Sequence, residues 1–387
     1  MGTIYRRKNK LWIGYRDVSG RWRYEATKYT PDQRALARKT LQAIERRVQA
    51  ELGHGAAEKG PPTVRSYGER WTRQREGMGI ASANDEEARL RRHAYPLLGE
   101  ILLRELRPRH VRDFVRQLRQ RRSARGPVLA PRTVRHVYFT VRRLLHDALV
   151  DELIDNNPCV LKRGELPGKV DRDPTWRAGA VFTRGEVEQI ISDDLVPLDR
   201  RVLYALLLLG GLRFGEAAAL RWRSYDPTVE PLGRLTVAFS YDTKRRKVKG
   251  TKTDRPREVP VHPTLAKVLA EWKLGAWQHL AGHAPQADDL IIPSRLGANR
   301  NANHMLRRFH EDLDRLKLRR RRQHDLRRTF ISLCLADGAR KDVLRWVTHG
   351  PSGDIMDLYT TLPWSALCSE VARLRIDRRE GRLLAIA

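Results

Sequence analysis

Two stretches without a regular apolar pattern divide this 387-residue chain into three parts, and they constrain its fold more than any other feature. Residues 53–63 read G-H-G-A-A-E-K-G-P-P-T, a composition typical of a linker. Residues 161–180 are polar, basic and broken by Pro and Gly, which favours a flexible connection between domains. The sequence therefore predicts three domains, at residues 1–55, 64–160 and 180–387.

The charge of the chain points to a polyanionic partner. Lys and Arg total 76 against 46 Asp and Glu, a net charge of +30. The excess is +8 over residues 1–60, +10 over 61–180 and +12 over 181–387, so every part is basic. This distribution favours one long polyanion, nucleic acid before an anionic membrane surface. The alternative is an arginine-rich surface that is merely solvated.

Several other classes of protein are disfavoured. The longest apolar run, residues 202–211, is far shorter than the roughly 20 residues that span a bilayer, and the N-terminus has no apolar signal segment. The three cysteines are far apart and suit neither a disulfide framework nor a zinc site. No glycine-rich nucleotide loop is present. We expect a cytoplasmic, nucleoid-associated protein that uses no membrane, metal or cofactor.

The first part predicts a small sheet followed by a helix. Residues 3–7, 11–16 and 21–27 read as three short strands, and helical spacing follows over 31–52. In the third strand Trp22 and Tyr24 alternate with arginines, so one face is aromatic and the other charged. We expect the helix to bury the aromatic face, with Trp12 and Tyr15 also in the core. The opposite face, with Arg21 and Arg23, would then be free to enter a DNA major groove.

The second part predicts a helical domain that ends at Asn157-Pro158. Helices are expected at 64–76, 84–95, 108–122 and 131–153. Arginines and valines lie on opposite sides of the last helix, an amphipathic arrangement that suits contacts with phosphates. A solvated face is the alternative. The candidate DNA-binding residues on this helix are Arg132, Arg135, Arg142 and Arg143.

The third part mixes helices with short strands. A T-x-x-E capping box at Thr183 and Glu186 starts its first helix. Strand-like 235–240 and 257–262 flank a basic hairpin region. The whole chain is therefore expected to be mainly α with small β-sheets. The helices expected in this part are 184–193, 198–210, 214–222, 263–280, 302–317, 325–336, 340–348 and 365–375.

Four islands of the third part carry groups that hold or activate a phosphate. Arg213, in G-G-L-R-F-G-E, lies between two helices, where helix-start amides and a guanidinium form an anion site. Lys252 lies at the tip of the expected hairpin, and a mobile ammonium there can protonate a leaving oxygen. His324 and Arg327 are three residues apart, so they share one face of a helix. Each island taken alone also has a purely structural interpretation.

The fourth island is V-T-H-G at 347–350, which contains His349 and is followed by Tyr359. A phenol has a pKa of about 10, so it becomes a nucleophile only beside a base and positive charge. The other islands supply both. Glu216, one helical turn after Arg213, is expected to brace the site.

The order of these residues resembles the catalytic domain of tyrosine recombinases, the phage-integrase family. The resemblance covers residues 180–387. Residues 64–160 resemble the helical core-binding domain of that family, and 1–55 the arm-type DNA-binding domain of lambda-like integrases. Thr348 stands where the family usually has Gly. The segments that carry the resemblance are G-L-R-F-G-E-A-A-A-L-R-W (211–222), T-K-T (251–253), H-D-L-R-R-T-F (324–330) and V-T-H-G…Y (347–359).

The resemblance implies site-specific recombination of double-stranded DNA by an integrase of a mobile element. Tyr359 would attack a phosphodiester and form a 3′-phosphotyrosyl bond. His324 would take the tyrosine proton, and Lys252 would protonate the departing 5′-oxygen. The remaining roles would be a clamp on the scissile phosphate by Arg213 and Arg327, a hydrogen bond to it from His349, and support from Glu216.

The resemblance also implies a homotetramer on core and arm DNA sites, with an accessory DNA-bending or excision factor as a further candidate partner. A C-terminal segment would dock onto a neighbouring protomer. The mechanism requires a buried phenol beside a phosphorus atom crowded by cations. Two alternatives stay open: a DNA-binding regulator that has lost catalysis, and an enzyme resembling type IB topoisomerases. The residues that suit the docking segment are Leu367, Val371, Leu374 and Ile376.

Overall fold

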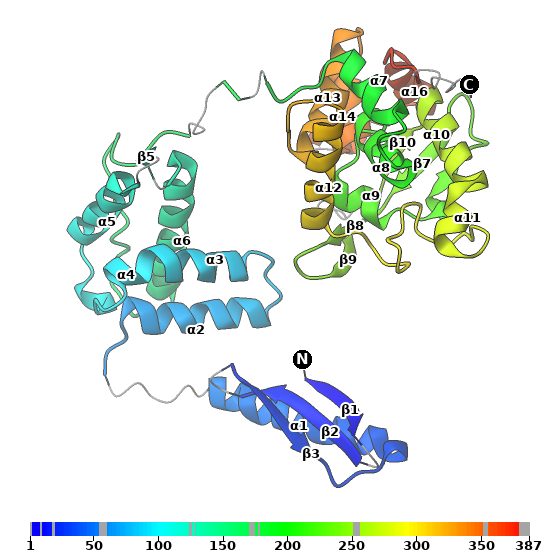
Figure 1. Ribbon diagram of the computed structural model, residues 1–387. Coiled ribbons are helices and arrows are strands. Elements are labelled where there is room, and N and C mark those ends of the chain that lie inside the picture. The colour runs from blue at the N-terminus through cyan, green and yellow to red at the C-terminus, as the bar shows by residue number, and fades with distance from the viewer. Residues whose placement is uncertain are drawn as a thin grey trace. The chain divides into compact units, whose positions relative to one another are not determined.

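The chain folds into two compact units, Met1–Pro174 and Thr175–Ala387 (Figure 1). Across the described residues the fold is mainly helical with small antiparallel sheets, which confirms the predicted fold class. The assignment of three functional domains stays a prediction. The computed structural model describes residues 2–7, 10–17, 20–53, 60–123, 126–127, 129–169, 175–176, 179–250, 256–350 and 355–378.

The first unit begins with the predicted three-stranded sheet. Strands β1 (Thr3–Arg7), β2 (Lys10–Arg16) and β3 (Trp22–Ala26) pair antiparallel in that order. A 3₁₀ turn (Pro31–Gln33) leads into α1 (Arg34–Gly53), which packs on the central strand β2 (Figure 1). The sequence-based strands and helix are thus confirmed.

Helix α1 covers the face opposite to the one that we expected. Leu11 and Ile13 of β2 are buried with Ala37 and Leu41 of the helix. The strand register places Trp22 and Tyr24 on the other face, where they are 41% and 55% exposed. The expectation that these rings form the core is therefore wrong, because the central strand supplies its own aliphatic face for the helix to bury.

The same strand register also shows that Arg23 does not lie on the open face of the sheet, where we expected it. Trp12 and Tyr15 are only half-buried. Arg23 pairs with Tyr15 across the strands, on the face that carries Leu11 and Ile13, and its Nε lies 2.8 Å from Asp17 Oδ2. The open face instead combines aromatic rings with cations, because the guanidinium of Arg16 lies 5.5 Å from the ring centre of Trp22.

The rest of the first unit is mainly helical, with a short two-stranded sheet of β4 (Arg122–Ser123) and β5 (Gly126–Pro127). Its core contains Tyr67, Phe114, Val137, Leu144 and Leu145. A π-helical turn at Leu90–Ala94 interrupts the single helix expected over 84–95. The helices are α2 (Val64–Gly77), α3 (Ala83–Arg89), α4 (Tyr95–Leu98), α5 (Pro108–Gln120) and α6 (Pro131–Val150).

The second unit is built around α8 (Leu198–Leu209), whose residues 201–209 are all buried. Helices α7 (Arg184–Ser192), α10 (Pro263–Leu274) and α13 (Gln323–Ala336) pack on it. The expected capping box of α7 is confirmed, because Thr183 N donates to Glu186 Oε2 at 2.7 Å and Glu186 N donates to Thr183 Oγ1 at 3.3 Å. The remaining helices are α9 (Phe214–Ala219), α11 (Ala276–Ala281), α12 (Ala302–Arg315), α14 (Lys341–His349), α15 (Ile355–Tyr359) and α16 (Trp364–Ala372).

Two small sheets complete this unit. One has the order β10-β7-β6, and the other is a hairpin of β8 and β9 that contacts α9. In the described part of the chain no helix is both long and apolar enough to cross a bilayer. The strands are β6 (Tyr225–Asp226), β7 (Arg234–Val237), β8 (Phe239–Asp242), β9 (Lys247–Gly250) and β10 (Arg257–Pro260).

The C-terminal segment packs on its own chain. Val371, Leu374 and Ile376 belong to the core of the second unit, and Leu367 packs against it. The buried Glu370 carboxylate accepts hydrogen bonds from Arg340 N at 2.7 Å and from Arg340 Nε at 2.9 Å. These four apolar residues therefore pack within their own chain, and docking of the segment onto a neighbouring protomer stays a prediction.

Candidate active site

The site begins at the turn between α8 and α9. Gly211 adopts φ +59°, and a Cβ atom there would lie 2.4 Å from the ring of Phe330, so both the backbone angle and the close approach require glycine. The turn places Arg213 at the start of α9. Its backbone N and its Nη1 both donate to the Glu216 carboxylate, each at 2.8 Å. Arg213 and Glu216, which are one helical turn apart, are thus paired.

A third residue, Arg257 at the start of β10, completes this arrangement. Its Nη1 and Nη2 donate to the two oxygens of Glu216 at 3.0 Å and 2.7 Å. Burial alone would raise the pKa of Glu216, but the hydrogen bonds and charges of Arg257 and then Arg213 lower that pKa to about 2. Glu216 is therefore a permanent anion held between two guanidinium groups.

Arg327 of α13 joins the same cluster. Its side chain is 2% exposed, and its Nη1 lies 4.0 Å from Glu216 Oε2. Nη1 donates to the carbonyl of Gly211, and Nη2 donates to the carbonyl of Thr348 at 2.6 Å. Burial, followed by the charge of Arg213, lowers the pKa of Arg327 to about 9. The structure thus brings together Arg213, Glu216 and Arg327, three of the site residues proposed from the sequence.

Two histidines lie beside this cluster. Burial of the His324 ring, with the charges of Arg328 and Arg327, lowers the pKa of His324 below its ordinary value. Burial and the nearby guanidinium groups of Arg327 and Arg213 lower the pKa of His349 to about 4. His349 Nδ1 lies 2.9 Å from Thr348 Oγ1. Both imidazoles are therefore neutral near pH 7 and can accept a proton.

Tyr359 ends the short helix α15 and is 83% exposed. The expectation of a buried phenol is wrong for this structure. Asp357 faces inward, where its Oδ1 lies 2.6 Å from Arg345 Nη2. Successive helical residues are about 100° apart, so Tyr359, two positions later, points away from that contact. Lys252 lies outside the described residues.

The arrangement can bind an anion. Three guanidinium groups surround one carboxylate, which leaves an excess of positive charge. The side chain of Arg213 is 42% exposed, whereas those of Arg257 and Arg327 are 6% and 2% exposed, so Arg213 is the most accessible of the three. Within the described ranges, no cluster of three or more His, Cys, Asp or Glu residues could hold a metal ion. A phosphate has the charge and the acceptor geometry that such a cluster recognises.

Helix α6 carries the arginines expected to contact DNA, and Arg143 and Arg135 are among those that have partners within the protein. Arg143 Nη1 lies 2.5 Å from the buried carboxylate of Glu86. Arg135 Nη1 donates to the carbonyl of Pro167 at 2.8 Å. Arg132 and Arg142 are exposed. The pattern of arginines along α6 did not reveal the buried Glu86, which comes from α3.

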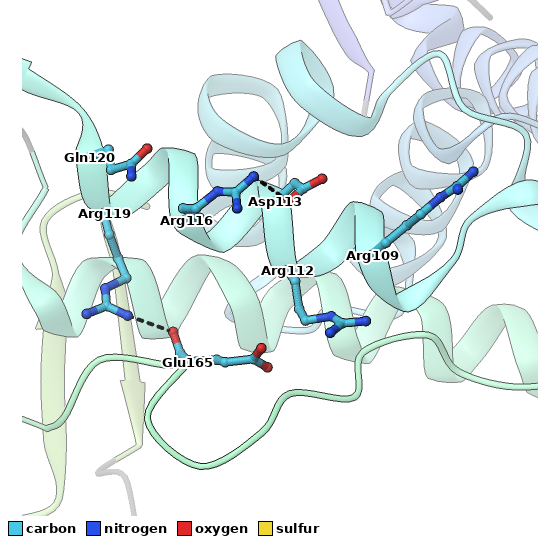
Figure 2. A pocket seen from close by; sticks show the side chains of 7 residues that line it. All are labelled: Arg109, Arg112, Asp113, Arg116, Arg119, Gln120 and Glu165. Atoms are coloured by element: carbon cyan, nitrogen blue, oxygen red, sulfur yellow. Dashed lines mark hydrogen bonds and ion pairs between the residues drawn. The ribbon is translucent and has the colours of Figure 1, made fainter.

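Sequence reasoning missed a second basic helix. Arg109, Arg112, Arg116 and Arg119 follow one another along α5 at intervals of three and four residues, which places them on one face. Figure 2 shows these side chains together with Glu165. They line a pocket of about 740 Å³. Arg116 Nη2 lies 2.7 Å from Asp113 Oδ1, and Arg119 Nη1 donates to the carbonyl of Glu165 at 3.0 Å. The signal was present as R-x-x-R-x-x-x-R-x-x-R with apolar residues on the opposite face.

The chain is similar to known integrases. It is 27% identical over 355 residues to the prophage phiRv2 integrase of Mycobacterium tuberculosis, a match that covers 87% of each chain. A Tn1549 transposon integrase in complex with a circular intermediate DNA matches with a TM-score of 0.62 and 16% identity, over 81% of this chain and 100% of that one. A lambda integrase tetramer bound to a Holliday junction matches with a TM-score of 0.53 and 16% identity, over 91% of this chain and 96% of that one. No protein-family model matches the chain. The two structural matches show that the fold is shared.

Proposed function

Because the chain belongs to the phage-integrase family of tyrosine recombinases, we propose that it is a site-specific DNA recombinase of a mobile element, with Tyr359 as its nucleophile. The observation that carries this assignment is the cluster of Arg213, Arg257 and Arg327 around the Glu216 carboxylate. Such a cluster suits a phosphate, and the net charge of +30 suits a long DNA partner.

In the proposed reaction the Tyr359 hydroxyl attacks the scissile phosphorus. An Oη–P bond forms while the P–O5′ bond breaks. His324 takes the phenol proton, which its lowered pKa permits at neutral pH, and Lys252 gives a proton to the departing 5′-oxygen. The 3′-phosphotyrosyl bond retains the energy of the phosphodiester, so a 5′-hydroxyl can reverse the step without ATP, metal or cofactor.

The charged groups stabilise the transferring phosphate. Arg213 and Arg327 hold its non-bridging oxygens, and Glu216 keeps Arg213 in place. His349 donates a hydrogen bond to the phosphate as the imidazolium, whose second proton the negative charge of that phosphate stabilises. Each such charge-assisted contact in a water-poor site contributes roughly 3–4 kcal/mol to the transition state. Arg327 already spans α13 and the end of α14, so it is rigidly placed before DNA arrives.

The three parts of the chain divide the contacts with DNA. Residues 180–387 are the catalytic domain, 64–160 the core-binding domain and 1–55 the arm-binding domain. The Arg109–Arg119 face of α5 and the exposed Arg132 and Arg142 of α6 contact phosphates. The open aromatic face of the N-terminal sheet, with Trp22 and Tyr24, faces the arm site. Recombination proceeds in a homotetramer on double-stranded DNA in the cytoplasm, and an accessory DNA-bending or excision factor assists it.

A suicide DNA substrate tests the nucleophile. We expect the wild type to form a covalent adduct at an authentic attachment site and Tyr359→Phe to form none, because the phenol oxygen is the attacking atom. Tyr241→Phe is the matched control, since Tyr241 lies in β8 of the same unit and should keep full adduct formation. An adduct with Tyr359→Phe would refute the assignment.

Two other experimental results would change the assigned function. Specific binding without cleavage at any authentic site would make the chain a DNA-binding regulator. Relaxation of supercoiled plasmid that lacks an attachment site would indicate an activity of the type IB topoisomerase kind.

A further inference from the structure

Arg257 connects three parts of the candidate site from a buried position. It lies at the start of β10 with its side chain 6% exposed. Two of its nitrogens bind the Glu216 carboxylate at 3.0 Å and 2.7 Å, and its Nε donates to the carbonyl of Val347 at 3.0 Å. Val347 lies two residues before His349, in the last turn of α14. A single guanidinium therefore ties α9 and α14 to the strand.

Glu216 transmits this contact to Arg213. Each oxygen of the carboxylate accepts one hydrogen bond from Arg257 and one from Arg213. The third charged group that faces Glu216 is Arg327, at 4.0 Å. The bidentate bond from Arg257 fixes the plane of the carboxylate, and that plane sets the direction in which Arg213 is held.

We propose that Arg257 is a positioning residue for DNA cleavage, which acts through Glu216 on Arg213 and through the Val347 carbonyl on the end of α14. This inference rests on the proposed function. Arg257 does not touch the phosphate, because all three of its nitrogens are engaged, two with Glu216 and one with the Val347 carbonyl. Its loss misplaces the groups that do touch it, and misplacement by about 1 Å reduces a rate on the order of 10²-fold.

The test measures single-turnover cleavage of the suicide substrate by full-length Arg257→Met and Arg257→Lys, with DNA affinity measured separately. We expect cleavage to fall on the order of 10²-fold in Arg257→Met and less in Arg257→Lys, which keeps the charge but loses the bidentate geometry. DNA affinity should change little, since the contacts that bind DNA are elsewhere. Equal cleavage by both variants and the wild type would overturn the inference.

Arg300→Lys is the matched control for loss of a buried arginine. Arg300 is 6% exposed, binds the carbonyls of Ile292 and Pro293, and lies 2.8 Å from Asp199. Assays run below the unfolding temperature of every variant should show normal cleavage by Arg300→Lys. If Arg300→Lys and Arg257→Lys lost cleavage equally, the effect would be one of folding, and the inference would fail.

The pH dependence of cleavage distinguishes a positioning role of Arg257 from a purely structural one, because loss of a structural contact alone would not shift it. Without Arg257, burial raises the pKa of Glu216, and this rise is opposed by Arg213, by Arg327 at 4.0 Å and by the His349 imidazole when it is protonated. Glu216 then gains a proton as the pH falls, and its hold on Arg213 is lost. We therefore expect the acidic limb of the cleavage profile to move to higher pH in Arg257→Met. A uniform loss at every pH would count against the inference.

A double-mutant cycle separates this inference from the proposed function. If Arg257 acts largely through Glu216, adding Arg257→Met to Glu216→Gln should reduce cleavage much less than it does in the wild type. Fully additive losses would overturn the inference while the recombinase assignment stood. Failure of the wild type to form any adduct would instead reject the proposed function itself.

Discussion

At the scale of single residues, the hydroxyl of Thr348 determines which ring nitrogen of neutral His349 carries the proton. Thr348 Oγ1 lies 3.0 Å from the carbonyl oxygen of Leu344 and 2.9 Å from His349 Nδ1. A hydroxyl has one proton, and a carbonyl can only accept it. Both contacts are satisfied only if Thr348 donates to Leu344 and Nδ1–H donates to Thr348. Neutral His349 then has an unprotonated Nε2, which accepts a hydrogen bond.

We predict that neutral His349 is the Nδ1–H tautomer and that Thr348→Val reduces this preference, because the acceptor of the Nδ1 proton is removed. Nitrogen-15 NMR of the imidazole measures the tautomer directly. Thr348→Ser keeps the hydroxyl and serves as the control, so it should match the wild type. A wild-type spectrum with the proton on Nε2 would contradict the assignment and would agree with the donor role that the family resemblance implied.

Individual residues of the site also show which of its parts can be predicted from the sequence. The spacing of Arg213 with Glu216 revealed a pair that one helical turn brings together. Arg257 escaped prediction because its partner lies 41 residues earlier, in another element, and the spacing of the sequence does not show that the start of β10 lies beside α9. The exposure of Tyr359 escaped because it depends on which side of α15 the Arg345–Asp357 ion pair holds inward.

At the scale of elements, the apolar spacing located most helices and strands to within a few residues. The single helix expected over 263–280 is two, because Gly275 has ψ −101° and breaks it between α10 and α11. The covered face of the N-terminal sheet was predicted wrongly because aromatic residues outnumber aliphatic ones in the strands. Leu11 and Ile13 nevertheless form the surface that α1 buries. Which face is covered depends on packing between elements, which spacing within one strand does not show.

Helix α5 allows a prediction about DNA binding. Each arginine that contacts a phosphate releases counterions, so log K falls with log[salt] by about 0.9 per contact on duplex DNA. We expect the double substitution of Arg109 and Arg112 by Ala to weaken binding and to reduce that slope by about 2. Fluorescence anisotropy over a salt series measures it. Arg73→Ala on α2 is the control, and an unchanged slope in the double variant would exclude this face from the interface.

At the scale of the whole molecule, the chain contains hydrophobic cores that share no residue. One core includes Leu144 in the first unit, and the other includes Leu207 in the second. The cluster of Arg213, Arg257 and Arg327 lies entirely in the second unit, whereas the basic face of α5 lies in the first. The arginine cluster and the basic face of α5 are therefore supported by different cores.

This separation predicts two unfolding transitions. Leu144 and Leu207 are 0% and 1% exposed, and truncation of such a buried leucine to Ala costs about 2–5 kcal/mol. We expect Leu144→Ala to lower the midpoint of one transition and Leu207→Ala that of the other, because each cavity weakens only the core that contains it. Differential scanning calorimetry of the full chain measures both. A single transition lowered equally by either substitution would show instead that the two cores unfold as one cooperative unit.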